Sequence, residues 1–84
     1  MRSGFGLYLK ELREKRGLSQ GKLARLLRLK TAQSVSNIER GISPMPASHV
    51  KRVAKILKTP PFTFARQAAN AERYEYLKRA GVSK

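Results

Sequence analysis

The sequence predicts an all-α fold in which five helices form a single domain over residues 1–84. Apolar residues recur three and four positions apart along most of the chain, which is the period of an amphipathic helix. Glycine and proline residues fall at intervals that suit helix boundaries, and no segment alternates polar and apolar residues as a strand does. Because the chain contains no cysteine, its small core must form without disulfides.

The first two helices are predicted from their apolar stripes and their end signals. The first runs from about Ser3 to Arg16, and Gly17 stands where a glycine commonly ends a helix. Ser19 is a natural N-cap for the second helix, because its side chain can accept a bond from an unpaired backbone N–H. Leu23 and Leu27 repeat at the spacing of one buried face.

The remaining helices are predicted in the same way. Thr31 can cap a short third helix that ends at Gly41. A fourth helix, over about residues 50–57, carries basic residues around its apolar stripe. A proline pair can open a fifth helix over residues 60–80, because proline is tolerated at the first helical position. This last helix is expected either to extend the core or to serve dimerisation.

Positive charge is the most informative feature of the composition. Nineteen Lys and Arg residues stand against five acids, and the formal net charge of +14 favours a polyanionic partner such as nucleic acid. Between Lys15 and Ala71 the one acid is Glu39, which needs an explanation of its own. A generally basic solvated surface, or attraction to anionic lipid, would also explain the charge, so the positions of particular residues have to decide.

Several other classes of protein are not expected. The chain has one histidine, no cysteine and five acids without an obvious catalytic grouping, so we expect no enzyme. We expect no cofactor and no metal site. No apolar run approaches the roughly 20 residues that span a membrane, and the first ten residues lack the apolar stretch of a secretory signal. The expected location is the cytoplasm.

Three separated elements of the chain match the pattern of a known family. They are the run Leu-Arg-Glu-Lys-Arg-Gly-Leu-Ser-Gln at 12–20, the dipeptide Leu-Ala at 23–24, and the run Ser-Val-Ser-Asn-Ile-Glu-Arg-Gly at 34–41. With these elements in a core of residues 5–58, the chain resembles the phage repressor and Cro, or XRE, family of helix-turn-helix regulators. The resemblance implies a lambda-repressor-like domain in which helices two and three form the helix-turn-helix. It also implies a prokaryotic or phage-encoded transcriptional regulator, usually a repressor, that binds the nucleoid.

Two departures from the family pattern concern the turn between helices two and three. The segment from Ala24 to Gly41 is one residue longer than the commonest pattern. Arg28 stands where the turn usually carries glycine. The resemblance therefore does not define the angle between the two helices.

The front of the third helix carries the residues that we expect to contact bases. A major groove about 12 Å wide admits one helix, and a second helix laid across the backbone sets its depth. Gln33 and Asn37 lie one turn apart, opposite the apolar face, and each amide can donate to adenine N7 and accept from N6. The alternative is an ordinary polar helix surface. The expected base contacts are Ala32, which can touch a thymine methyl group, and Gln33, Ser36 and Asn37.

Phosphate contacts are expected at the starts of helices two and three, in the turn between them and just beyond the third helix. The positive ends of the helix dipoles and the basic side chains both favour anions there. The alternative for each lysine is a solvated surface charge. The expected contacts are Gln20, Lys22, Arg28, Lys30, Thr31, Ser34, Arg40 and Ser43.

The resemblance also implies a structural role for the isolated acid. In related proteins an arginine on the first helix pairs with the glutamate near the end of the third, and the corresponding residues here are Arg13 and Glu39. Such a pair would join the recognition helix to the rest of the domain. Removing one partner of a largely buried pair typically costs about 3–5 kcal/mol.

Double-stranded DNA is the expected partner, in the form of a palindromic operator bound by a homodimer. One short helix contacts few base pairs, whereas a twofold dimer presents two such helices about 34 Å apart. Tyr74, Tyr76 and Leu77 are candidates for the dimer interface, with the core as their alternative. Two other functions stay open: a nonspecific nucleic-acid-binding or DNA-compacting protein driven by charge, and the antitoxin subunit of a toxin-antitoxin pair, which would have a protein partner.

Overall fold

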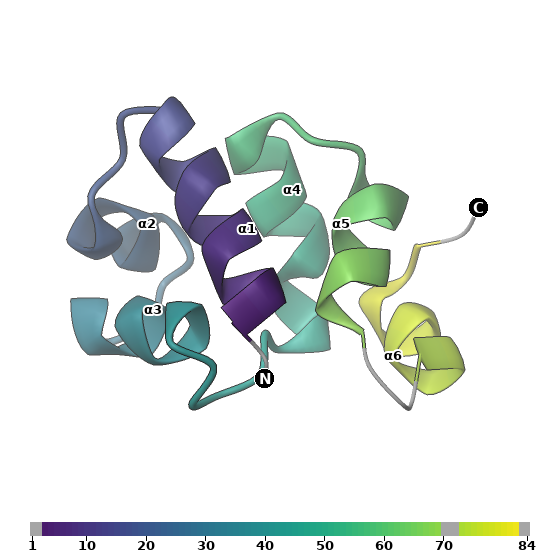
Figure 1. Cartoon of the computed structure of the whole chain (residues 1–84). Coiled ribbons are helices and arrows are strands. Elements are labelled where there is room, and N and C mark those ends of the chain that lie inside the picture. Colours follow the sequence, from purple (N-terminus) through teal and green to yellow (C-terminus); the bar gives the residue numbers. More distant parts are fainter. Residues whose placement is uncertain (1–2, 70–72, 83–84) are drawn as a thin grey trace. The chain divides into compact units, whose positions relative to one another are not determined.

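The computed structural model of the chain describes residues 3–69 and 73–82, and every regular element in that part is helical (Figure 1). The all-α prediction is therefore confirmed for the described residues. A single turn of 3-10 helix, labelled η1, precedes the fourth α-helix. The elements are α1 (Ser3–Lys15), α2 (Gln20–Leu26), α3 (Ala32–Glu39), η1 (Ala47–His49), α4 (Val50–Leu57), α5 (Pro61–Ala68) and α6 (Arg73–Ala80).

The contacts divide the chain into two compact units, here called the N-terminal unit (Met1–Pro44) and the C-terminal unit (Met45–Lys84). Within the N-terminal unit, α3 packs against both α1 and α2. Each of these helices contributes apolar side chains that are almost fully buried, as the predicted stripes require. The buried apolar residues of this unit are Leu9, Leu23, Ala24, Leu27, Val35 and Ile38.

The ends of the helices in the N-terminal unit follow local chemistry. The hydroxyl of Ser19 accepts a bond of 3.0 Å from the backbone N–H of Lys22, so the predicted N-cap of α2 is confirmed. Gly41 has a φ of +79° after the last turn of α3, a conformation that glycine adopts without steric cost. Thr31 occupies the N-cap position of α3 with an extended backbone, but its side chain makes no capping bond.

The turn between α2 and α3 has a left-handed residue at the position where the family usually has glycine. Arg28 adopts the left-handed conformation itself, with a φ of +60°. The backbone N–H of Leu29 then donates to the carbonyl of Ala24 over 2.8 Å, which closes the end of α2 in the way a glycine normally would. Arg28 therefore carries backbone strain that a glycine at this position would avoid.

The C-terminal unit is built around α4 and the two helices that follow it. η1 leads directly into α4, α5 packs against α4, and α6 contacts both η1 and α5. The side chains that face inward are apolar, with Phe64 the largest of the fully buried ones. The buried residues of this unit are Met45, Val50, Val53, Ala54, Leu57, Phe64, Ala65, Tyr76 and Ala80.

The prediction of one helix over residues 60–80 is wrong, because this segment contains two helices. Pro61 does open a helix, as predicted, but α5 ends at Ala68 and Ala69 is extended, with φ −74° and ψ 155°. A continuous helix of about 20 residues would be some 30 Å long, too long to bury both of its ends in so small a unit. With two helices, both Phe64 and Tyr76 are buried.

Candidate nucleic-acid interface

The outer side of α3 carries the residues predicted to contact bases. Val35 and Ile38 face inward, with 1% and 6% of their surface exposed. Gln33 is exposed, whereas Ala32, Ser36 and Asn37 are half-buried. These four residues lie on a short helix that packs against α1 and α2 through its apolar residues, and we call them the ridge on α3.

Two of these side chains are hydrogen-bonded to each other. The amide nitrogen Nε2 of Gln33 donates to Oδ1 of Asn37 over 2.9 Å, and this bond is exposed. The residues are four positions apart, a spacing at which helix side chains meet. The backbone carbonyl of Asn37 in turn accepts bonds from the N–H groups of Ile42 and Ser43, so the loop after α3 is held against the end of the helix.

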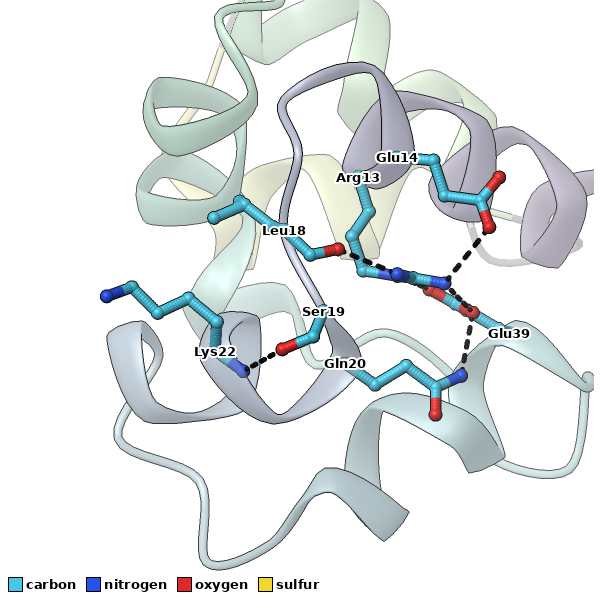
Figure 2. A network of polar contacts seen from close by, with 7 residues as sticks. All are labelled: Arg13, Glu14, Leu18, Ser19, Gln20, Lys22 and Glu39. Atoms are coloured by element: carbon cyan, nitrogen blue, oxygen red, sulfur yellow. Dashed lines mark hydrogen bonds and ion pairs between the residues drawn. The ribbon is translucent and has the colours of Figure 1, made fainter.

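The residues predicted to bind phosphate lie around this ridge with different degrees of exposure. Ser34 and Ser43 are half-buried, and Ser34 lies in the first turn of α3. The exposed side chain of Lys22 extends away from the other side chains drawn in Figure 2. The fully exposed candidates are Lys22, Arg28, Lys30, Thr31 and Arg40.

Gln20 has a partner that the sequence did not predict. Its Nε2 donates to Oε1 of Glu39 over 3.0 Å, so its amide group joins α2 to the end of α3. The carbonyl oxygen of the same amide points away from Glu39 (Figure 2). A residue predicted for phosphate contact is thus also part of the polar network inside the unit.

Arg13 and Glu39 form the centre of that network (Figure 2). Arg13 Nε donates to Glu39 Oε2 over 2.6 Å and Nη2 donates to Oε1 over 3.1 Å, a bidentate arrangement. Nη1 donates to the backbone carbonyl of Leu18 over 2.8 Å. The two side chains are only 8% and 5% exposed, so this ion pair is buried.

The network stabilises the charged form of Arg13. The hydrogen bond from Arg13 to Glu39 raises the pKa of Arg13, burial opposes this, and the nearby carboxylates of Glu39 and Glu14 add to the rise. Every buried polar side-chain atom among the described residues has a hydrogen-bond partner. Glu39, the one acid between Lys15 and Ala71, therefore neutralises the buried Arg13. Through its bonds to Arg13 and Gln20 it joins α3 to α1 and α2.

Gly6 allows α1 to approach α3 closely, a role that the sequence analysis missed. A side chain at this position would collide with the backbone carbonyl of Glu39. Glycine costs about 1 kcal/mol relative to alanine inside a helix, so a glycine within the predicted first helix was the signal that could have shown a close contact.

The three candidates for the dimer interface have different environments. Tyr76 is 9% exposed, and its hydroxyl donates to the backbone carbonyl of Met45 over 2.7 Å. Tyr76 thus lies in the core of the C-terminal unit. Burial raises the pKa of Tyr76, while Arg79 opposes the rise, so the hydroxyl stays protonated. Leu77 is half-buried, and the side chain of Tyr74 lies outside the described residues.

The exposed side of α4 is basic. Its buried face is entirely apolar, whereas Lys51, Arg52, Lys55 and the C-capping Lys58 are all exposed. No acid occurs in the sequence between Glu39 and Glu72. We call these four residues the α4 basic face.

The described part of the chain contains no group of three or more His, Cys, Asp or Glu side chains that could hold a metal ion. None of its helices has both the length and the apolar character needed to cross a membrane.

A family model described as a helix-turn-helix domain matches residues 5–67, which are 63 of the 84 residues. No curated protein and no solved structure matches the chain. The matched segment contains most of α1, all of α2 to α4 and most of α5, and so includes both the ridge on α3 and the Arg13–Glu39 network.

Proposed function

Because the chain belongs to the helix-turn-helix family of DNA-binding domains, we propose that it is a sequence-specific transcriptional regulator, of the phage repressor and Cro type, that inserts α3 into the major groove. The observation that carries this proposal is the hydrogen-bonded amide pair of Gln33 and Asn37 on the outer side of α3. Amide side chains match the donor and acceptor pattern of base edges in the major groove.

The packing around α3 supports the same function. Recognition by a short helix requires that its position be fixed to a fraction of a hydrogen-bond length. The buried pair of Arg13 and Glu39, together with the amide of Gln20, holds the C-terminal end of α3 against α1 and α2. In this arrangement α2 lies across the sugar-phosphate backbone, and the exposed cations near both helix starts contact phosphates.

The regulator acts as a homodimer on a palindromic operator. A single α3 of eight residues covers only a few base pairs, so specificity in a genome requires a second copy. Leu77 is the remaining described candidate for the dimer contact, because Tyr76 is part of the core. The protein represses by occupying its operator in the cytoplasm and catalyses no reaction.

The experiment that tests this function is selection of bound sequences from a random duplex library near physiological salt. A specific regulator prefers its operator over random duplex by roughly 10³-fold or more. The Gln33→Ala, Asn37→Ala double variant should lose the enriched palindrome while keeping its fold. An unchanged operator in the double variant would show that α3 is not the recognition element.

The α4 basic face favours a second candidate, a charge-driven nucleic-acid binder without sequence preference. Its four exposed cations have no acid between residues 39 and 72 to balance them. Under this alternative no site is enriched, and binding weakens steeply with salt. Replacing Lys51 and Lys55 with Gln should then reduce the dependence of affinity on salt by about two phosphate contacts.

A further inference from the structure

The hydrogen bond between the two amides on α3 determines which of their atoms can contact DNA. A primary amide has two N–H donors and an oxygen with two lone pairs. Because Gln33 Nε2 donates to Asn37 Oδ1 over 2.9 Å, Gln33 keeps its whole oxygen and one N–H. Asn37 keeps both N–H groups and one lone pair of its oxygen, but the bond directs that oxygen toward Gln33.

The two residues therefore present different patterns to a duplex. The remaining groups of Gln33 are one acceptor and one donor, which is the pattern that pairs with N6 and N7 of adenine. Asn37 presents two N–H donors to the duplex, whereas the oxygen through which it would accept from adenine N6 is turned toward Gln33. Guanine presents two acceptors, O6 and N7, on its major-groove edge and so fits a donor group.

We propose that Gln33 and Asn37 act as one coupled unit, in which Gln33 selects adenine and Asn37, oriented by Gln33, selects guanine at the neighbouring position. This inference rests on the proposed function, because it concerns how the same helix recognises its operator. It replaces the expectation that both amides select adenine, which treats each side chain as free to rotate. The backbone of Asn37 is also held, since its carbonyl accepts from Ile42 and Ser43.

Coupling has a consequence that independent contacts lack: removing one side chain changes the base chosen by the other. In Gln33→Ala the oxygen of Asn37 is released, so Asn37 can pair with N6 and N7 of adenine. The preference at its position should change from guanine to adenine, by roughly 10-fold for a bidentate contact.

A second variant separates orientation from recognition. In Asn37→Asp the carboxylate still accepts the bond from Gln33, so the adenine preference of Gln33 should persist. The carboxylate has no donor, and the guanine preference should be replaced by one for cytosine, whose N4 group donates. Asn37→Ala removes the support altogether and should weaken the adenine preference as well.

The test is the same duplex selection, run on the wild type and on the three variants with a matched control. Gln67→Ala is that control, because Gln67 is an exposed glutamine on α5, outside the ridge on α3. It should leave the preference at both positions unchanged. Thermal unfolding by circular dichroism checks that each variant is folded, as expected for substitutions in an exposed pair.

Each outcome of the selection is decisive. A change from guanine to adenine in Gln33→Ala supports the coupled unit. An operator that is enriched in the wild type but keeps the same base at the Asn37 position in Gln33→Ala overturns the inference and leaves the proposed function intact. Adenine at the Asn37 position of the wild-type operator also overturns the inference and leaves the proposed function intact. If no site is enriched by the wild type, the proposed function fails and the inference fails with it.

Discussion

The two compact units differ in the kind of polar group that each one buries. The N-terminal unit buries the ion pair of Arg13 and Glu39, with side chains 8% and 5% exposed. The C-terminal unit buries the neutral hydroxyl of Tyr76, which donates to the carbonyl of Met45. Among the described residues, the N-terminal unit is therefore held partly by charge, whereas the C-terminal unit combines apolar packing with a buried neutral hydrogen bond.

The buried ion pair of the N-terminal unit explains how the position of α3 is specified. Apolar contacts are non-directional and tolerate small shifts of one helix over another. A bidentate ion pair has one good geometry, and its desolvation makes any other geometry unfavourable. The charged network lies at the end of α3, where Arg13 and Gln20 both reach Glu39. The unit that carries the recognition ridge thus has the directional contacts.

The largest expected effect is that of breaking the buried ion pair. Glu39→Ala leaves Arg13 buried without its counter-charge and should lower the free energy of unfolding by about 3–5 kcal/mol. Urea denaturation monitored by circular dichroism measures the loss. Glu14→Ala is the control, because Glu14 is 57% exposed and 4.0 Å from Arg13, and it should change stability by less than about 0.5 kcal/mol. Equal stability of the two variants would contradict the importance of the buried pair.

Adding one methyl group to α1 should have the next largest effect. Gly6→Ala forces a side chain against the carbonyl of Glu39 and should destabilise the protein by about 1–3 kcal/mol. Gly4→Ala is a matched control on the same helix, because nothing lies within 4 Å of the added atom. Alanine is the better helix former, so this control should be neutral or slightly stabilising. If both variants unfold at the same urea concentration, α1 and α3 are not in close contact.

The C-terminal unit should respond more weakly to loss of its polar contact. Tyr76→Phe removes the donor to Met45 and should cost about 1 kcal/mol at neutral pH, the usual value of a neutral hydrogen bond. Thermal unfolding measures this loss. A cost as large as that of Glu39→Ala would remove the contrast between the two units.

Alkaline pH provides a second way to test this unit. Because burial raises the pKa of Tyr76, the folded state favours the protonated phenol. The associated stability is fully present below the ordinary pKa near 10 and is lost as the pH rises toward the folded value. Above pH 10 the wild type should therefore lose stability faster than Tyr76→Phe. Identical pH profiles would show that the hydroxyl is not buried.

The smallest expected effect is a gain in stability at the turn before α3. Arg28 has a φ of +60°, which is unfavourable for any residue with a Cβ atom. Arg28→Gly should relieve this strain and stabilise the protein by up to about 1 kcal/mol. Arg28→Ala loses the same charge but keeps the Cβ atom, so it should show no such gain. DNA affinity should fall in both variants if the exposed guanidinium binds phosphate.

The sequence could predict the parts of this fold that depend on near neighbours. The ends of α1 to α3 depend on residues within about four positions, and the predicted cap of Ser19 on Lys22 is confirmed. Thr31 lies at the predicted N-cap position of α3 but makes no capping bond with its side chain. The helix over residues 60–80 was mispredicted because a helical period continues through the segment. Only packing of α6 against α5 and η1 opposes a continuous helix there.

The candidate site divides in the same way. Its residue types and their positions along α3 could be read from the sequence, including the amides of Gln33 and Asn37. The bond between them could not, because a spacing of four permits a contact without deciding which atom donates. The hydrogen bond from Gln20 to Glu39 was not predicted, because the two residues lie 19 positions apart in the sequence.

Periodicity and capping act over a single turn, so the amino-acid sequence alone predicts the all-α class, the approximate ends of the first four helices and the residue types on α3. The close approach of Gly6 to α3, the sharing of Glu39 by Arg13 and Gln20, and the end of α5 at Ala68 emerge only when the helices pack. These features depend on the burial of distant side chains together. Burial is a property of packed helices in three dimensions, which no local pattern contains.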